Sequence, residues 1–324
     1  MKIITDIKEP RVSVEWHRRT DYWPEIVGGK SIFSDIKAVI RLFLLCHKYD
    51  IAVLGGSRKT TIFTMLLALW PGEKIPVLMI DCLWYKPRNS LGLCLKKIQL
   101  QLMAQAIDRF VVWASHEKKD YATVFHISEQ KFLYIPHHHT LEGYEFEVSE
   151  GDYIFSGGDG DRDYSTLLKA VEGLGIKVII GTRLTNWNDG VAIPQGVEAF
   201  PTSQLDFRKW MAGSRLVVIP MKKGLLHSGG QQTYLNAMAM GKPVIVADDC
   251  GAKDYIEDGV NGLIVPAGDA EALRNAIKSI LDNAEISTKL SNNAKDAYVS
   301  FSTPKCMERI LQAAEKIVLE KSVK

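Results

Sequence analysis

Short apolar segments alternate with amphipathic helical patterns along most of this chain, and this alternation restricts the fold more than any other feature. Parallel strands that are buried on both faces read as continuous apolar runs, and a crossover helix must separate each from the next. We therefore expect an α/β protein with doubly wound parallel sheets. Strands are expected at 51–54, 77–80, 110–113, 132–135, 153–156, 177–180, 197–200, 215–219, 243–247 and 262–265. Helices are expected at 31–48, 59–70, 91–108, 163–174, 204–213, 231–241 and 253–257.

The chain has 324 residues, which is more than one compact core usually supports, so two domains are expected. Residues 141–152 are acidic, contain glycine and lack a clear period, which is typical of a linker. We predict an N-terminal domain over 1–150, a second domain over 151–302 and a C-terminal helical segment over 303–324.

Charge and cysteine usage exclude several classes of protein. Forty basic and thirty-eight acidic residues give a net charge of +2, which argues against a nucleic-acid-binding protein. The cysteines are odd in number and lack metal-ligand spacing, so we expect no disulfide framework and no zinc site. They are Cys46, Cys82, Cys94, Cys250 and Cys306. The N-terminus lacks the apolar core of a signal peptide, so a cytoplasmic location is expected.

The most informative segment is a glycine-containing loop that follows an apolar strand and opens directly into a helix, at 228–233. The unpaired backbone amides expected at this helix start, together with the helix dipole, favour a bound diphosphate. These amides belong to Gly230, Gln231, Gln232 and Thr233. Gly229 and Gly230 would let a ligand approach the main chain, so a bulky residue at 230 should impair binding with little effect on folding. Without further context a tight packing turn is an equally good interpretation.

A second glycine-rich loop follows the strand at 153–156 and carries Gly157, Gly158 and Arg162. A glycine-rich turn after the first strand of a doubly wound domain is typical of phosphate binding, and Arg162 could form charge-assisted hydrogen bonds to phosphate. The alternative is a surface ion pair between Arg162 and Asp159 or Asp163. Arg183, Lys222 and Lys223 also follow strands and could reach the same ligand. A solvated loop charge is the favoured interpretation for each lysine and an equally good one for Arg183.

The run from Ala237 to Asp269, which reads AMAMGKPVIVADDCGAKDYIEDGVNGLIVPAGD, resembles the donor-binding signature of retaining GT-B glycosyltransferases of family 4. The resemblance implies two Rossmann-like domains that face a central cleft. It also implies transfer of a sugar from a nucleotide-diphosphate sugar to an acceptor hydroxyl of a glycan, lipid or protein, with retained configuration. No metal and no cofactor other than the donor are implied.

The sequence departs from the family signature at several positions. The two family glutamates, which contact the sugar and the ribose, fall on Ser228 and Asn236, and Gly158 replaces a family arginine. The SGGQQ of 228–232 is similar to a variant of the helix start found in a subgroup. We therefore expect a divergent donor site in which Ser228 and Arg162 serve catalysis and Asn236 approaches the ribose.

Resemblance over the N-terminal half is weak and rests on segments such as 49–57 and 75–84. Gly55, Gly56 and Ser57 follow one strand and could border the acceptor. Asp81 stands where the family commonly has histidine, so it could serve catalysis by orienting an acceptor hydroxyl or the donor sugar, although an aspartate at a strand end is as often a cap.

Two further segments each allow two interpretations. The triplet at 137–139 invites a metal site, but neighbouring side chains on an extended chain point to alternating faces, so we expect a loop near the linker. The segment 84–113 is apolar with interspersed lysine and arginine, which favours a core helix but leaves peripheral membrane contact open.

The helix over 303–320 should have Thr303 as its cap and Pro304 as its first residue, and should return to the N-terminal domain as in GT-B proteins.

The same fold also serves other functions. A catalytically silent sugar-nucleotide-binding subunit and a nucleotide-sugar epimerase are the alternatives. The absent glutamates favour the silent subunit, whereas the intact helix start and the AMAMGKPV segment favour an enzyme.

Overall fold

The computed structural model describes residues 1–8, 13–23, 32–248 and 251–323, and the chain divides into two compact units. Unit 1 comprises Met1–Ile135 together with Pro304–Lys324, and unit 2 comprises Pro136–Thr303. The boundary after Ile135 lies before the expected one near residue 150. The reason is that 136–149 is anchored to unit 2, for example through the hydrogen bond from the Ser149 N–H to the Ala212 carbonyl (3.2 Å).

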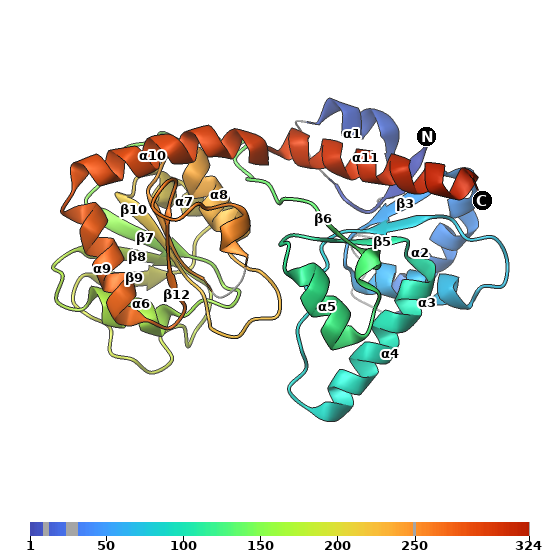
Figure 1. The fold of residues 1–324 in the computed structure, drawn as a ribbon, viewed down its shortest axis with the longest axis horizontal. Helices are drawn as coiled ribbons and strands as arrows, with labels where there is room; N and C mark the ends of the chain where they lie inside the picture. Colours follow the sequence, from blue (N-terminus) through green and yellow to red (C-terminus); the bar gives the residue numbers. More distant parts are fainter. Residues whose placement is uncertain (9–12, 24–31, 249–250, 324) are drawn as a thin grey trace. The chain divides into compact units, whose positions relative to one another are not determined.

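Unit 1 contains a parallel six-stranded sheet in the order β2-β1-β3-β4-β5-β6 (Figure 1). Its strands are β1 (Ile3–Thr5), β2 (Thr20–Tyr22), β3 (Ile51–Leu54), β4 (Val77–Met79), β5 (Arg109–Val112) and β6 (Phe132–Tyr134). Its helices are α1 (Val14–Arg19), α2 (Ile32–Leu45), α3 (Arg58–Leu69), α4 (Ser90–Ala106), α5 (Glu117–Phe125) and α11 (Thr303–Ser322). Short 3-10 turns follow at Cys46–Lys48 and Glu129–Lys131. β1, β2, α1 and α5 were missed from the sequence. β1 and β2 have three residues each and α1 has six, which is too short to show a period.

Unit 2 contains a second parallel six-stranded sheet in the order β12-β11-β10-β7-β8-β9. Its strands are β7 (Tyr153–Gly157), β8 (Lys177–Gly181), β9 (Val197–Phe200), β10 (Leu216–Pro220), β11 (Val244–Asp248) and β12 (Leu263–Pro266). Its helices are α6 (Tyr164–Val171), α7 (Gln204–Ala212), α8 (Gln231–Ala239), α9 (Ala270–Leu281) and α10 (Ala284–Tyr298), with 3-10 turns at Ala252–Asp254 and Val299–Phe301. Each of these strands lies within one or two residues of its expected range.

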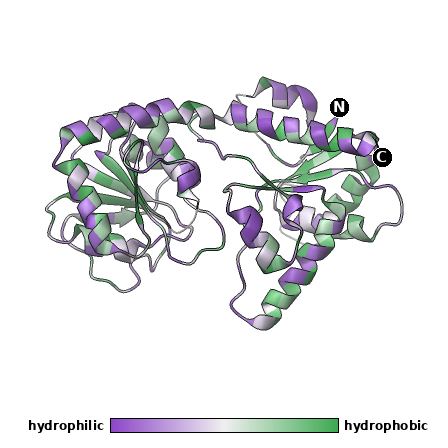
Figure 2. Cartoon of the chain, viewed as in Figure 1, coloured by the Kyte–Doolittle hydropathy of each residue, from purple (hydrophilic) through white to green (hydrophobic). Residues whose placement is uncertain are grey.

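Both faces of the unit 2 sheet are covered by helices, as a parallel sheet requires. Side chains of α7 and α8 form one core cluster with the strands, and those of α6 and α9 form the other. Most strands of the two sheets are hydrophobic (Figure 2), whereas the edge strands β2 and β9 carry Asp21 and Glu198.

No helix in the described part of the chain is long and apolar enough to cross a membrane. Helix α4 buries Leu100 and Met103 in the core and exposes Leu91 and Leu95. Contact of the segment 84–113 with a membrane surface stays a prediction.

The last helix, α11, belongs to unit 1 although it follows unit 2 in the chain. Its buried side chains Met307, Ile310, Leu311 and Ile317 join a core cluster with strands of the unit 1 sheet. The helix includes Thr303 as its first residue, and the Thr303 hydroxyl donates to Glu142 Oε2 (3.0 Å). The role of Thr303 as a cap stays a prediction.

Replacing Ile310 with alanine should destabilise unit 1, because this side chain is fully buried between α11 and the sheet. A loss of about 2–5 kcal/mol in the free energy of unfolding is expected for such a cavity. Urea unfolding followed by circular dichroism measures it. Leu319→Ala is the matched control, because Leu319 of the same helix is 65% exposed and its change should stay within about 0.5 kcal/mol. Equal losses in both variants would contradict the packing described for α11.

Candidate functional site

The two glycine-rich loops follow β7 and β10, which are neighbours in the unit 2 sheet. From β7 the chain continues outward through β8 and β9, then returns to β10 on the other side of β7 and continues to β12. The strand order therefore reverses between β7 and β10. In open α/β sheets ligands bind at this reversal, beyond the carboxyl ends of the strands.

Arg162 is buried (7% exposed) where these two loops meet. Its Nε donates to the Gly157 carbonyl (3.0 Å), and its Nη1 donates to the Gly160 carbonyl (2.8 Å) and to Met221 Sδ (3.0 Å). Its Nη2 donates to Thr233 Oγ1 in the first turn of α8 (3.3 Å). One guanidinium thus fixes the loop after β7 against the start of α8.

The positive charge of Arg162 has no carboxylate partner within ion-pair distance in the described ranges. Asp159 instead binds Arg183 (Oδ2 to Nη2, 2.6 Å), and Asp163 caps α6 by accepting from the Thr166 N–H (3.1 Å). The alternative of a surface ion pair between Arg162 and either aspartate is therefore wrong. Burial lowers the pKa of Arg162, but a guanidinium stays charged at neutral pH.

The start of α8 adds to this positive potential. Gly230 precedes the helix in the left-handed region (φ +82°), and the N–H groups of Gln231 and Gln232 have no acceptor in the described part of the chain. The Thr233 amide was expected to be unpaired as well, but it donates to the Gly230 carbonyl (2.9 Å) because the first turn is tight. A buried cation beside a helix N-terminus creates a site that favours an anion.

Interior packing accounts for the glycines themselves. A Cβ on Gly230 would lie 3.0 Å from Ile219 Cγ2, and one on Gly229 would lie 2.6 Å from Met221 Cε. The expectation that a bulky residue at 230 would spare folding is therefore wrong. Gly158 also has a positive φ (+116°), and a Cβ there would lie 2.8 Å from Arg162 Nη2, whereas Gly157 leaves room for the ring of Phe207.

The other expected cations are exposed at neighbouring strand ends. Arg183 follows β8 with its side chain 78% exposed and pairs with Asp159. Lys222 and Lys223 are exposed after β10, where the Lys222 N–H donates to the Asp161 carbonyl (2.9 Å). Their contact with a phosphate stays a prediction.

A buried histidine at this site was missed from the sequence. His227 is 4% exposed, and its Nε2 lies 3.0 Å from Asp161 Oδ2, which ties the loop before α8 to the loop after β7. Asp161 adopts a left-handed backbone conformation (φ +52°). The pair joins residues that are 66 positions apart, so no local pattern could reveal it.

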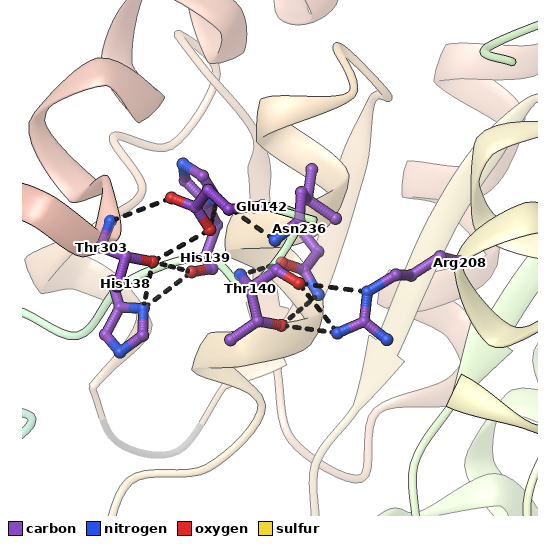
Figure 3. A network of polar contacts seen from close by, with 8 residues as sticks. His138, His139, Thr140, Glu142, Arg208, Asn236 and Thr303 are labelled. Carbon is purple, nitrogen blue, oxygen red and sulfur yellow. Dashed lines mark hydrogen bonds and ion pairs between the residues drawn. The ribbon is translucent and has the colours of Figure 1, made fainter. Parts of the chain in front are cut away.

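The two positions of the family glutamates differ in their surroundings. Ser228 is buried in the loop and its hydroxyl accepts a hydrogen bond from Gln231 Nε2. Asn236 is hydrogen-bonded to Thr140: its Oδ1 accepts from the Thr140 N–H (2.7 Å) and its Nδ2 donates to Thr140 Oγ1 (3.2 Å) (Figure 3). Its approach to a ribose stays a prediction.

Asn236 is part of a polar network that anchors residues 138–142 within unit 2 (Figure 3). Arg208, another residue missed from the sequence, donates from Nη2 to the Thr140 carbonyl (2.9 Å). Thr303 Oγ1 donates to Glu142 Oε2 (3.0 Å) and lies 2.9 Å from His138 Nδ1. The segment that enters unit 2 and the residue that leaves it are thus bonded to each other.

The histidine triplet is part of this anchoring segment. His138 and His139 are buried, and the His137 N–H donates to the Tyr255 hydroxyl (2.9 Å). Within the described ranges, no group of three or more His, Cys, Asp or Glu residues could hold a metal ion. Cys46, Cys82, Cys94 and Cys306 are free thiols, and Cys250 lies outside the described residues.

The acceptor-side residues gather at the carboxyl edge of the unit 1 sheet. Gly55, Gly56 and Ser57 follow β3, and Asp81 follows the adjacent β4 with a left-handed backbone (φ +57°). Ser57 caps α3 by accepting from the Thr60 N–H (3.2 Å). A Cβ on Gly56 would lie 2.6 Å from the Asp81 carbonyl oxygen, so these two loops are in close contact.

Asp6, at the end of β1, joins this edge and was missed because β1 has only three residues. Its Oδ1 accepts a hydrogen bond from the Gly55 N–H (2.6 Å). Burial raises the pKa of Asp6 from 3.8 to about 6, and the negative charge of Asp81 contributes to the rise. Burial also raises the pKa of Asp81. Two carboxyl groups with raised pKa values thus border this edge.

The substitution Asp6→Asn tests the raised pKa. The folded state binds the Asp6 proton more tightly than the unfolded state, so wild-type stability should fall as pH rises from about 4 to about 6. Urea unfolding of both proteins across this range should show Asp6→Asn gaining stability relative to wild type, with a constant difference above pH 7. A difference that is the same at pH 4 and pH 7 would contradict the raised pKa.

Comparisons with known proteins agree with this architecture. Residues 167–283, which include α8, match the family model described as "Glycosyl transferases group 1". The chain is 26% identical over 163 residues to the lipopolysaccharide core biosynthesis glycosyltransferase LpsE of Rhizobium meliloti, and 27% identical over 85 residues to the putative glycosyltransferase EpsD of Bacillus subtilis. These matches cover 50% and 26% of this chain, but only 41% of LpsE and 22% of EpsD.

Similarity to solved structures extends over nearly the whole chain. HepE from Anabaena, solved in complex with UDP, aligns with a TM-score of 0.70 at 14% identity, covering 98% of this chain and 100% of HepE. A glycosyltransferase from Rickettsia africae aligns with a TM-score of 0.65 at 16% identity, covering 98% of this chain and 90% of its own. The two-domain α/β fold of the GT-B type predicted from the sequence is confirmed.

Proposed function

We propose that this chain is a glycosyltransferase that moves a sugar from a nucleoside-diphosphate sugar to an acceptor hydroxyl. One observation carries the proposal: the buried Arg162 has no carboxylate partner in the described ranges and contacts the first turn of α8, at the reversal of strand order. A diphosphate at this position would supply the missing negative charge. It would also accept hydrogen bonds from the Gln231 and Gln232 amides.

The comparisons support a sugar-nucleotide donor over other phosphates. The matched family model describes glycosyl transferases, and HepE is solved with UDP, with UDP-glucose, and with UDP and glucose. We assign the chain to the retaining family 4 type, because the run from Ala237 to Asp269 resembles that signature.

The chemistry would place the protein's positive charge where negative charge develops. The bond from the anomeric carbon to the diphosphate oxygen breaks, and a new bond forms from the anomeric carbon to the acceptor oxygen. In the retaining mode the acceptor proton passes to the departing phosphate, so no separate carboxylate base is required. Arg162 and the amides at the start of α8 stabilise the leaving diphosphate. Ser228, Gly229 and Gly230 form the loop that reaches this leaving group.

Residues at the edge of the unit 1 sheet are proposed to bind the acceptor. Asp81 and Asp6 lie on adjacent loops beside Gly55, with carboxyl groups whose pKa is raised. A protonated carboxyl group can donate to a hydroxyl oxygen, and an ionised one can accept from a hydroxyl proton. Both forms suit a polyhydroxylated acceptor.

A catalytically silent sugar-nucleotide-binding subunit is the second candidate. It is favoured by Ser228 and Asn236, since neither supplies the carboxylate that the family places there, and Asn236 is occupied by Thr140. Incubation with labelled UDP- and GDP-sugars separates the two: an enzyme should release nucleoside diphosphate with hydrolysis or transfer of the sugar. Binding with no turnover, in the presence of glycan, lipid and protein acceptors, would favour the silent subunit.

Donor binding should stabilise the protein against unfolding. At a hundred times its dissociation constant, a ligand adds about 2.7 kcal/mol to the free energy of unfolding. A thermal-shift series with UDP, GDP and their sugar conjugates measures the effect. The absence of any shift with these nucleotides at saturating concentrations would count against a donor site.

Replacing Arg162 with alanine should weaken UDP binding by about 10- to 100-fold, because charge-assisted hydrogen bonds to the diphosphate are lost. Binding of uridine, which has no phosphate, should change much less. Isothermal titration calorimetry gives both constants.

Arg274→Ala is the matched control for this variant. Arg274 of α9 also donates to backbone carbonyls, those of Ala170 (3.0 Å) and Glu172 (2.6 Å), but away from the two glycine-rich loops. The ratio of UDP to uridine affinity should be unchanged in Arg274→Ala. A similar fall in that ratio for both variants would mean that Arg162 acts on folding alone.

A further inference from the structure

Met221 lies directly opposite Arg162, in a short antiparallel bridge between the segments that follow β10 and β7. The residues beside this pair form the backbone hydrogen bonds of the bridge, for example from the Asp163 N–H to the Pro220 carbonyl (2.8 Å). Arg162 and Met221 are therefore a non-hydrogen-bonded pair, the kind in which opposite side chains lie closest together. Backbone pairing thus places the side chain at position 221 beside the guanidinium.

The Met221 side chain is buried between Arg162 and the loop before α8. Its Sδ accepts a hydrogen bond from Arg162 Nη1 (3.0 Å). A Cβ on Gly229 would lie 2.6 Å from Met221 Cε, and one on Gly230 would lie 3.4 Å from Met221 Sδ. One side chain therefore packs against the buried cation and against the two glycines that precede the helix.

The guanidinium of Arg162 has five N–H donors, and four of them meet uncharged acceptors. These acceptors are the carbonyls of Gly157 and Gly160, Met221 Sδ and Thr233 Oγ1. The fifth donor, on Nη2, has no acceptor among the residues that the structure describes. It is on the side where Gly158 lacks a side chain, because a Cβ on Gly158 would lie 2.8 Å from Nη2. Arg162 is thus held by dipoles alone, and one donor stays available to a ligand.

We propose that Met221 is a positioning residue of the donor site, which orients Arg162 while leaving its positive charge to the ligand. A thioether sulfur is a weak, uncharged acceptor, so it fixes the guanidinium without neutralising it. A carboxylate at position 221 would instead form an ion pair with Arg162 and compete with the diphosphate for its charge. The inference rests on the proposed function, because the ligand that it names is the donor diphosphate.

This arrangement lowers the stability of the protein without its ligand. Burying a cation is unfavourable unless an opposite charge compensates it. Position 221 is a place where a single acidic side chain could supply that charge, because the bridge sets it opposite Arg162. A neutral residue there is typical of a binding site, where stability is given up so that a charge stays available to the ligand.

Met221→Glu and Met221→Gln are a matched pair, because the two new side chains have the same shape and differ in charge. At pH 7 Met221→Glu should unfold at a higher urea concentration than Met221→Gln, since an ion pair replaces an unpaired buried charge. When each is combined with Arg162→Gln, this order should disappear or reverse, because the carboxylate then has no partner. Urea unfolding of the four proteins, followed by circular dichroism, gives the midpoints.

Ligand binding should change in the opposite direction to stability. Isothermal titration calorimetry should show Met221→Glu binding UDP about 10- to 100-fold more weakly than Met221→Gln, because Arg162 is already paired. The affinities of the two variants for uridine, which has no phosphate, should agree within about threefold. Inorganic diphosphate should raise the thermal unfolding midpoint of Met221→Gln more than that of Met221→Glu. A purely structural role of Met221 would not produce opposite changes in stability and in phosphate binding.

Three results would overturn the inference. The first is equal UDP binding by Met221→Glu and Met221→Gln, which would mean that the ligand does not use the charge of Arg162. The second is a Met221→Glu variant that unfolds no later than Met221→Gln. The third is the absence of any effect of inorganic diphosphate on wild type and on both variants. Failure of the proposed function would look different: none of the proteins would bind UDP, while inorganic diphosphate would still stabilise Met221→Gln more than Met221→Glu.

Discussion

The buried charge of Arg162 is the constraint on which the rest of the unit 2 site depends. Its guanidinium holds the carbonyls of Gly157 and Gly160 and reaches Thr233, so it fixes both glycine-rich loops relative to each other. Burying a cation is costly unless an opposite charge compensates it. The nearby aspartates are bonded elsewhere, and the start of α8 adds further positive potential. The proposed diphosphate would complete this arrangement.

Contacts among neighbouring residues hold the two glycine-rich loops in one geometry. His227 bonds to Asp161 and so joins the same two loops at a second point. Asp159 bonds to Arg183 and links the loop after β7 to the end of β8. A preorganised phosphate site needs such supporting contacts, because donors that must rearrange on binding stabilise a leaving group less.

Helix α8 also anchors the segment of the chain that enters unit 2. Asn236 on α8 and Lys242 after it both bind the segment that enters unit 2, at Thr140 and at the Ser149 carbonyl. Burial lowers the pKa of Lys242 to about 8. The first turn of α8 borders the proposed phosphate site, and Asn236 and Lys242, further along the chain, anchor the incoming segment. The resemblance of this helix to the family signature therefore bears on how the chain enters unit 2 as well as on the proposed donor site.

Sequence patterns predicted the strands of unit 2 and the helix start at Gln231, because buried parallel strands and glycine turns leave local signals. They could not predict Asp6, whose strand is too short, nor Arg208, whose partner Thr140 is 68 residues away. The contact of Asn236 with Thr140 could not be predicted either, because the two residues are 96 positions apart in the sequence. A glycine before a helix predicts a positive φ such as that of Gly230. The contacts with Ile219 and Met221 that leave no room for a side chain at Gly230 could not be predicted from the sequence.

A crystal structure of the protein in complex with UDP tests the central claim most directly. The account predicts diphosphate oxygens within hydrogen-bond distance of the Gln231 and Gln232 amide nitrogens, on the side of α8 where Arg162 meets Thr233. A well-defined UDP whose diphosphate lies away from the start of α8 would contradict it.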